Sequence, residues 1–212
     1  MRYERKYRIE NASLRQVEQV IHQNSACFQT AFPDRWINSI YLDDVAFNSL
    51  NENLGGISKR NKYRIRWYGN TLKDIQEPTL EIKIKNNFTN TKQFFKLPNF
   101  TLNSDFDCVQ FLENQIPNLQ QRLFPVSIIQ YLRSYYVSQN GKVRATIDRK
   151  LRYFLYQGRL LLEHSPAQDA GIILEIKYDK DYDDQMQPIF QMIPFRLTKN
   201  SKYVSSINAH YI

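Results

Sequence analysis

Basic side chains recur at every second position in several extended stretches of the chain. Lys62, Arg64 and Arg66 alternate with aromatic and aliphatic residues, so they share one face of a predicted strand. Guanidinium groups offer planar donor forks that match phosphate oxygens, and ammonium groups add compact positive charge. We therefore interpret such faces as candidate binding surfaces for phosphate-rich anions.

Five predicted strands carry faces of this kind. The residues that share a face are Arg2, Glu4, Lys6 and Arg8; Lys62, Arg64 and Arg66; Glu81, Lys83 and Lys85; Arg144, Thr146, Asp148 and Lys150; and Glu175 with Lys177. These faces hold 11 cations against 4 carboxylates, and the balance of +7 nearly equals the formal charge of +8 of the whole chain. The basic character of the protein is therefore concentrated on strand faces.

A sheet with one face in water is the alternative explanation of the alternation. It does not explain the sign of the charge, because solvated faces usually mix lysine with glutamate. Like charges on one strand face lie about 7 Å apart and repel by roughly 2.4 kcal/mol at an effective dielectric constant of about 20. A concave or closed sheet tolerates them only with bound anions or admitted solvent. The hypothesis is that the faces converge on one polyanion-binding cavity.

A minority of carboxylates stands among these cations. Glu4, Glu81 and Glu175 are hard oxygen ligands of the kind that suits Mg²⁺ or Mn²⁺ bridging phosphates. A face that only binds DNA has less use for carboxylates, so we expect no DNA partner. The sequence thus favours a complex of condensed phosphate with a divalent metal.

Length and composition indicate one globular domain over residues 1–212. The chain has 212 residues, 42% of them hydrophobic, and a pI near 9.4. Cys27 and Cys108 are too few for a disulfide scaffold or a cysteine zinc site. No uncharged apolar run approaches the roughly 18 residues of a membrane span, and the charged N-terminal residues do not resemble a signal peptide. We expect a cytoplasmic protein that does not itself span a membrane.

The remaining candidate motifs favour structural roles. His22, His164 and His210 show no metal-ligand spacing, and no glycine-rich nucleotide loop is present. Tyr131, close to Arg133, would suit stacking on a nucleobase, although a core aromatic is the favoured interpretation.

Periodicity predicts many short strands with a few helices. Strands are predicted over residues 2–10, 35–42, 59–68, 79–85, 91–97, 126–137, 143–149, 153–156, 160–163 and 172–178. A helix over 14–24 begins at a capping box of Ser13 and Gln16. Further helices follow Asp43 or Asp44 and begin at Ser104 or Asp105, and the tail from about residue 184 is predicted helical, ending at 199–203. The fold class is α+β, with an antiparallel sheet large enough to curl or close.

Taken in order, these segments resemble the triphosphate tunnel (CYTH-like) superfamily, and most closely its vacuolar transporter chaperone (VTC) type, the polyphosphate polymerase domain. The matching segments are Arg2-Tyr3-Glu4-Arg5-Lys6-Tyr7, Ser39-Ile40-Tyr41-Leu42-Asp43, Tyr63-Arg64-Ile65-Arg66-Trp67-Tyr68-Gly69, Leu80-Glu81-Ile82-Lys83, Tyr131-Leu132-Arg133, Val143-Arg144-Ala145-Thr146-Ile147-Asp148, Leu174-Glu175-Ile176-Lys177 and Ser201-Lys202-Tyr203. The resemblance implies an antiparallel β-barrel of about eight strands, flanked by a few helices, whose bore holds a triphosphate or polyphosphate.

The resemblance also implies roles for individual residues. Phosphate contacts would come from Lys6, Arg64, Arg66, Lys83, Arg133, Arg144 and Lys202, with the hydroxyl of Ser201, the ammonium of Lys177, and Lys92 or Lys96, of which Lys92 is favoured. Glu175 would hold a divalent metal, Mn²⁺ or Mg²⁺. The superfamily's Glu-x-Glu-x-Lys motif has Arg2 in place of its first carboxylate here. Metal binding therefore falls to Glu175, Glu4 and Glu81.

By resemblance, the activity is metal-dependent transfer of the terminal phosphoryl group of ATP to a growing polyphosphate chain. ATP and polyphosphate would be the partners, and any coupling to a membrane would need a partner chain. Two alternatives stay open at this point. One is an inorganic or nucleoside triphosphatase of the same architecture, and the other is a binding module for polyphosphate or nucleic acid.

Overall fold

The computed structural model describes residues 2–87, 89–119, 121–156 and 165–211. The chain divides into two compact units. The first unit comprises Met1–Arg35, Tyr131–Leu151 and Asp169–Asn200, and the second comprises Trp36–Gln130, Arg152–Gln168 and Ser201–Ile212. Among the described helices, none is long and apolar enough to cross a bilayer.

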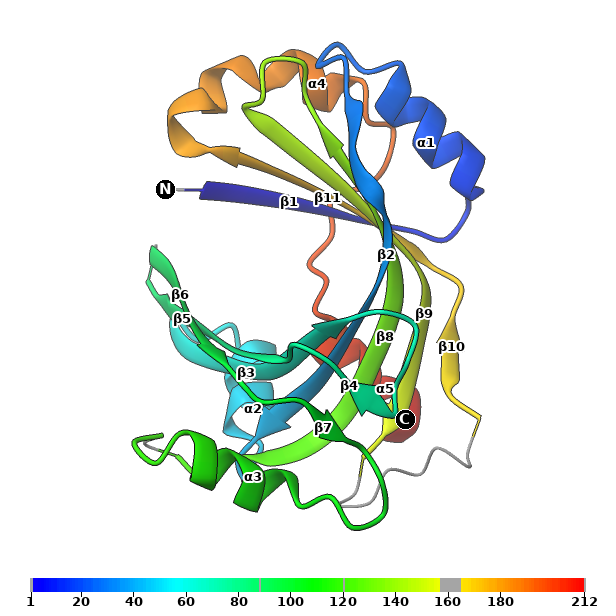
Figure 1. The fold of residues 1–212 in the computed structure, drawn as a ribbon. Coiled ribbons are helices and arrows are strands. Elements are labelled where there is room, and N and C mark those ends of the chain that lie inside the picture. Colours follow the sequence, from blue (N-terminus) through cyan, green and yellow to red (C-terminus); the bar gives the residue numbers. More distant parts are fainter. Residues whose placement is uncertain (1, 88, 120, 157–164, 212) are drawn as a thin grey trace. The chain divides into compact units, whose positions relative to one another are not determined.

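Most of the described strands belong to one nine-stranded sheet (Figure 1). Its strands are β1 (Arg2–Ile9), β2 (Gln29–Asp43), β3 (Lys59–Tyr68), β5 (Thr79–Asn86), β6 (Thr89–Lys96), β8 (Phe124–Val137), β9 (Val143–Leu155), β10 (Ala167–Asp169) and β11 (Ile172–Asp179). The order is β1-β11-β9-β8-β2-β3-β5-β6, with β10 paired to β9. Strands β2, β8, β9 and β10 each contain residues of both units.

The helices are short, and a small second sheet accompanies the large one. The helices are α1 (Leu14–His22), α2 (Asn48–Leu54), α3 (Cys108–Gln115), α4 (Gln187–Gln191), α5 (Lys202–Tyr211) and the 3₁₀ helix η1 (Lys180–Gln185). The small sheet pairs β4 (Asp74–Ile75) with β7 (Phe100–Thr101).

In the first unit, helices cover the apolar face of β1, β11 and β9. Val17 and Ile21 of α1 and Ile189 of α4 pack with Leu174 and Ile147 of the strands. The register pairs Tyr7 with Leu174 and Leu174 with Ile147, so apolar side chains form continuous rows across the three strands. The polar residues of the same strands therefore occupy the other face.

In the second unit, the apolar face of β2, β3 and β5 packs against α3 and the small sheet. Ile40, Ile65 and Leu80 are neighbours in register and fully buried. Leu112 of α3 and Ile75 of β4 belong to the same core cluster. The side chains that alternate with these residues again lie on the opposite face of the sheet.

Helix α5 is held to the second unit by a buried polar contact. The hydroxyl of Tyr203 donates to the Asp43 carboxylate at 2.7 Å, and its ring stacks on Tyr41 with centroids 5.4 Å apart. Asp43 also accepts the backbone N–H groups of Ser49 and Leu50 at the start of α2. One carboxylate therefore fixes both α2 and the start of α5, where Ser201 and Lys202 lie.

The predicted α+β class with a large antiparallel sheet and few helices is confirmed. Ser13 and Gln16 form the predicted capping box of α1. Gly141 has a positive φ of 71° in the turn between β8 and β9, and its N–H donates to the carbonyl of Ser138.

Four predicted boundaries are wrong. Helix α3 begins at Cys108, after an Asp107 N-cap, and not at Ser104 or Asp105. Strand β9 continues unbroken through 143–155, where two strands are predicted, because Lys150 adopts a positive φ of 52° and the ladder resumes. The segment 199–203 precedes and begins α5 instead of ending a helix. Strand β2 starts at Gln29, earlier than predicted, with mostly exposed residues that give no hydrophobic signal. The predicted strand 160–163 and His164 lie outside the described residues.

We expect Tyr203→Phe to lower the free energy of unfolding by about 1.5–3 kcal/mol, because it removes a hydrogen bond to a buried carboxylate. Urea denaturation of both proteins measures the difference. Tyr68→Phe is the control, since Tyr68 is 51% exposed and its loss of a hydroxyl should change stability by less than about 0.5 kcal/mol. Equal effects of the two substitutions would contradict the buried contact.

Candidate functional site

The polar face of the first unit carries four alternating charges on β1 and β11. Glu4 lies opposite Lys177, and Lys6 lies opposite Glu175. Lys6 Nζ is 2.6 Å from Glu4 Oε1 and 3.5 Å from Glu175 Oε2. Lys177 Nζ also forms ion pairs with Glu4 and with Glu175. The two predicted metal ligands Glu4 and Glu175 are thus brought together around shared ammonium groups.

The next strand extends this face. The register places Arg144 beside Lys177 and Thr146 beside Glu175. Arg144 is exposed, whereas Thr146 Oγ1 is buried and has no hydrogen-bond partner. A buried hydroxyl without a partner lowers stability, so its position beside Glu175 is compatible with a bound ligand oxygen.

Arg133 has a fixed orientation in the same unit. Its Nε and Nη2 donate to the two oxygens of Asp148 at 2.5 and 2.7 Å, and Asp148 is fully buried. Tyr131 is 2% exposed, with the Arg133 guanidinium 5.3 Å from its ring centroid. This environment leaves the Tyr131 ring little surface for a nucleobase.

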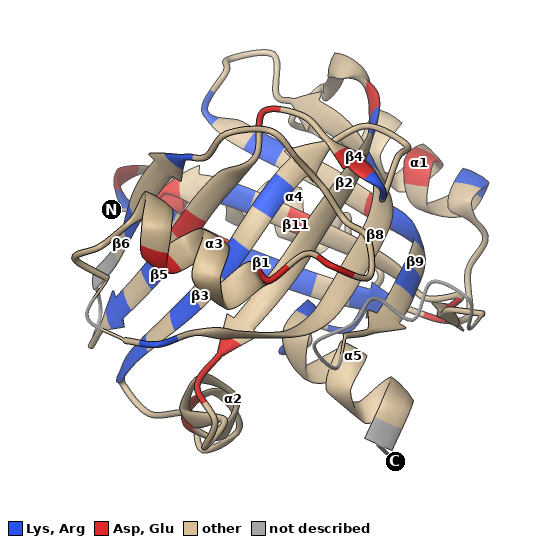
Figure 2. Cartoon of the chain, turned by 60° about the horizontal axis from the view of Figure 1, so that its bottom comes forward, with Lys and Arg blue, Asp and Glu red and all other residues tan. Residues whose placement is uncertain are grey.

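The polar face of the second unit is a grid of cations on β3, β5 and β6. Lys62 lies opposite Lys83, which lies opposite Lys92, so three lysines form one row across three strands. The neighbouring rows are Tyr41, Arg64, Glu81 and Phe94, then Ser39, Arg66, Thr79 and Lys96. Lysine and arginine segments recur along the strands (Figure 2). The alternation seen in the sequence is therefore in register between neighbouring strands.

Glu81 holds the two central arginines of this grid. Its Oε2 accepts from Arg64 Nε at 2.8 Å and from Arg64 Nη2 at 2.5 Å, and its Oε1 is 3.1 Å from Arg66 Nη1. Arg64 Nη1 donates to the hydroxyl of Tyr41 at 3.2 Å. Glu81 is 9% exposed, so the carboxylate and both guanidiniums interact in a largely desolvated setting.

These charges shift the titration of their neighbours. Burial by itself raises the pKa of Glu81, but the charges of Arg64 and Arg66 outweigh burial and hold that pKa below its usual value. Burial likewise opposes ionisation of Tyr41, and Arg64 with Lys202 brings the Tyr41 pKa below its usual value. Desolvation, together with the charges of Arg64 and Lys83, lowers the pKa of Lys92. The grid thus favours anions over further cations.

The start of α5 contributes to the same face. Lys62 Nζ donates to Ser201 Oγ at 3.1 Å, and the charge of Lys202 acts on Tyr41. Ser201, just before α5, and Lys202, its first residue, are both predicted to contact phosphate, and they lie beside β3 and β2.

The predicted site residues fall into two groups. Glu4, Lys6, Tyr131, Arg133, Arg144, Glu175 and Lys177 belong to the first unit; Arg64, Arg66, Glu81, Lys83, Lys92, Lys96, Ser201 and Lys202 belong to the second. Each group gathers around one polar sheet face. That the two faces line one bore stays a prediction.

Sequence reasoning left several neighbours out of the site. Lys62 was placed on the basic strand face with Arg64 by its spacing, but the resemblance gave it no phosphate contact. Tyr41 and Ser39 lie on the same polar face of β2, in a stretch where every residue from Ile37 to Asp43 is buried, so no hydrophobic alternation marks them. Asp148 was counted on a charged face, but its pairing with Arg133 depends on strand register.

Among the described residues, no group of three histidine, cysteine or acidic side chains could hold a metal ion by itself. Glu4 and Glu175 approach the same ammonium groups, and two carboxylates plus substrate phosphates are a usual set of Mg²⁺ ligands. The donor set of the first unit therefore fits a divalent metal that arrives with a phosphate ligand. Glu81 interacts with two arginines instead.

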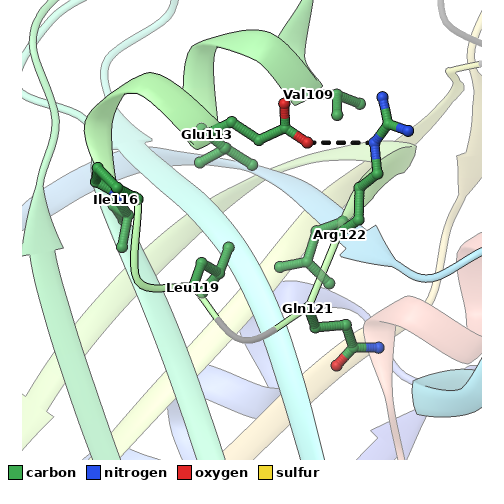
Figure 3. Close-up of a pocket in the computed structure, with 9 residues that line it drawn as sticks. Val109, Glu113, Ile116, Leu119, Gln121 and Arg122 are labelled. Carbon is green, nitrogen blue, oxygen red and sulfur yellow. Dashed lines mark ion pairs between the residues drawn. The ribbon is translucent and has the colours of Figure 1, made fainter.

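A pocket of about 260 Å³ lies elsewhere in the second unit, beside α3 (Figure 3). Val109, Ile116 and Leu119 line it together with Glu113 and Arg122. Its ion pair, Arg122 Nε to Glu113 Oε1 at 3.2 Å, joins two largely exposed side chains. This pocket mixes apolar and polar side chains, and Arg122 is its one cation among the lining residues.

The lowered pKa of Glu81 predicts acid sensitivity. A carboxylate whose folded pKa is depressed stabilises the fold above its unfolded pKa of about 4.3, and that stability is lost as pH falls through the folded pKa. We expect Glu81→Gln to lose less free energy of unfolding than the wild type between pH 7 and pH 3, measured by urea denaturation. Glu113→Gln, at an exposed ion pair, is the control that should retain the wild-type slope. An unchanged slope in Glu81→Gln would contradict the assigned contacts.

Solved structures share this fold at low sequence identity. A Hippeastrum protein, described as a candidate adenylyl cyclase with a dominant triphosphatase activity, matches with a TM-score of 0.57 and 12% identity over 98% of this chain and 96% of its own. A candidate adenylate cyclase from Bacillus halodurans matches with a TM-score of 0.56 and 11% identity over 99% and 96%. One from Vibrio parahaemolyticus matches with 0.54 and 11% over 95% of each chain. No curated protein matches the chain.

The polar faces, the sheet order and these neighbours agree with the fold class predicted from the strand segments. A family model described as the VTC domain covers residues 1–211, nearly the whole chain. The protein therefore belongs to the VTC domain family and has the triphosphate tunnel fold.

Proposed function

We propose that this chain is a metal-dependent polyphosphate polymerase, which transfers the terminal phosphoryl group of ATP to a growing polyphosphate chain. The family and the fold support an enzyme of the triphosphate-binding kind. Within this class of enzymes, the length of the cation grid in the second unit supports a polymerase.

The grid extends farther than a triphosphate. Arg60, Lys62, Arg64 and Arg66 share one face of β3, and residues two apart in a strand are separated by about 6.8 Å, so the four span about 20 Å. Lys83 and Lys85 of β5 lie opposite Lys62 and Arg60. A triphosphate has only three phosphorus atoms joined by two bridging oxygens and is shorter than this strip. A longer condensed phosphate would contact all four residues of this strip, from Arg60 to Arg66.

The proposed reaction needs no covalent intermediate on the protein. A terminal oxygen of the polyphosphate attacks the γ-phosphorus of ATP, the bond from that phosphorus to the β–γ bridging oxygen breaks, and ADP leaves. Arg64 and Arg66, held by Glu81, would bind and orient the phosphoryl oxygens and neutralise charge that develops on them. Lys6, on the polar face of the first unit, would also contact phosphate oxygens.

A divalent metal would bind Glu4 and Glu175 together with phosphate oxygens. Mn²⁺ or Mg²⁺ would supply additional positive charge to those oxygens when bound. The side chains Lys6 and Lys177, which contact both carboxylates, keep the pair close together before metal arrives.

A triphosphatase of the same fold is the second candidate. The Hippeastrum neighbour, described with a dominant triphosphatase activity, favours it. Both reactions need the same cations, and they differ in whether water or a phosphate oxygen reaches the γ-phosphorus. A binding module without turnover would retain the cation grid but would not require Glu175.

Purified protein incubated with ATP and Mn²⁺ should form phosphate chains that resolve on a gel, and Glu175→Gln should reduce their rate of formation by about 10²–10³-fold. Glu10→Gln is the control, because Glu10 directly follows β1, the neighbour of β11 in the sheet, and its side chain is 64% exposed. Release of free phosphate without chains would contradict the polymerase proposal and support the triphosphatase. Full activity of Glu175→Gln would remove its assignment as a metal ligand.

Tripolyphosphate at about 100 times its dissociation constant should stabilise the folded protein by roughly 2.7 kcal/mol, and longer polyphosphate should bind more tightly because it contacts more of the strip. Arg64→Ala combined with Arg66→Ala should abolish the increase in melting temperature for both ligands in a thermal-shift assay. Arg122→Ala, outside the grid, should retain it. Equal ionic strength of chloride serves as the salt control, and an equal shift with chloride would show that binding is nonspecific.

A further inference from the structure

One side chain on the polar face of the second unit has no role in binding phosphate. Phe94 is a large apolar residue in the row that contains Arg64 and Glu81, yet 60% of it is exposed. We propose that Phe94 is the stacking platform for the nucleobase of the nucleoside triphosphate donor. This inference rests on the proposed function and adds a base-binding subsite to it.

The register places Phe94 among cations. It lies directly opposite Glu81 of β5, and Lys92 and Lys96 flank it two residues away on β6. Residues two apart point to the same face at a separation of about 6.8 Å. An uncharged ring therefore lies with an ammonium group on each side, at the margin of the arginine and lysine rows.

The exposure of Phe94 separates it from other aromatic residues. Tyr41, in the same row, is 7% exposed and already stacked on Tyr203. Tyr131, considered for base stacking from the sequence, is 2% exposed beneath the Arg133 guanidinium. These rings already have partners on the faces that a base would need.

Two further rings provide comparisons with Phe94. Phe95, the next residue, lies opposite Leu80 and so faces the apolar side of the sheet. Tyr68, 51% exposed, shares the polar face at the end of β3, but its own hydroxyl explains its contact with water. Phe94 has no polar atom that would account for its exposure.

The chemistry of a nucleoside triphosphate matches this arrangement. Its base is a flat uncharged ring system, and its phosphates carry several negative charges on a short tether. An exposed aromatic ring binds a base by stacking without reading its hydrogen-bonding edge. Lys92 and Lys96 would attract the phosphates beside it, and the row through Glu81 leads from Phe94 to Arg64.

The test compares two ligands that differ in the base. Isothermal titration calorimetry measures the affinity for the β,γ-imido analogue of ATP, which is not consumed, and for tripolyphosphate. Phe94→Ala should weaken binding of the ATP analogue by about tenfold or more and leave the affinity for tripolyphosphate unchanged. Phe94→Tyr, which keeps the ring, should retain the wild-type affinity.

Phe95→Ala and Tyr68→Ala are the matched controls, and both should bind the ATP analogue as the wild type does. Unchanged binding of the analogue by Phe94→Ala would overturn the inference. An equal loss for both ligands would also overturn it, because the ring would then support the lysines and not the base. Wild-type protein that binds tripolyphosphate but not the analogue excludes the subsite.

The experiments distinguish failure of the polymerase proposal from failure of the base-binding subsite. If Phe94→Ala selectively weakens the analogue but no chains form from ATP, the base subsite stands and the polymerase does not. If chains form and Phe94→Ala binds the analogue normally, the polymerase stands and the subsite does not. If the wild-type protein binds neither the ATP analogue nor tripolyphosphate, both proposals are wrong.

Discussion

Crowding of like charges on a sheet face is the constraint on which this structure depends. Arg64 and Arg66 occupy neighbouring positions on one face of β3 and would repel each other in a site with little water. Glu81 contacts both, and although burial raises its pKa, the charges of Arg64 and Arg66 outweigh burial and lower that pKa, which favours the charged carboxylate. The arginines are therefore held in fixed positions before any anion binds, which reduces the reorganisation needed on binding.

Both units meet the same constraint in similar ways. In the first unit Glu4 and Glu175 alternate with Lys6 and Lys177, and Asp148 binds Arg133. In each unit the opposite face of the sheet is apolar; helices cover it in the first unit, and α3 with the small sheet covers it in the second. The buried apolar rows stabilise the strands, and the charged rows can then be retained for ligand binding at some cost in stability. The carboxylates thus maintain the cationic faces as well as offering oxygen to a metal.

Much of the site was predictable because side chains alternate along a strand. The alternation of Lys62, Arg64 and Arg66 with apolar residues identifies their shared face from the sequence alone, and the capping box of Ser13 and Gln16 marks the start of α1 in the same way. Local patterns of this kind depend only on residues close together in the chain. The boundaries of β9 and α5 were not predictable, because Lys150 at positive φ and the contact of Tyr203 with Asp43 depend on distant partners.

The sequence by itself determined which side chains are cationic, which strand face they share and which family they resemble. Only the tertiary structure decided that Lys62, Lys83 and Lys92 stand in one row, that Glu81 binds two arginines, and that Phe94 is exposed while Tyr131 is buried. The reason is physical. The alternation of side chains between the two faces of a strand follows from the extended backbone alone. Which residue lies beside a given side chain on the next strand depends on the register between segments that are distant in sequence.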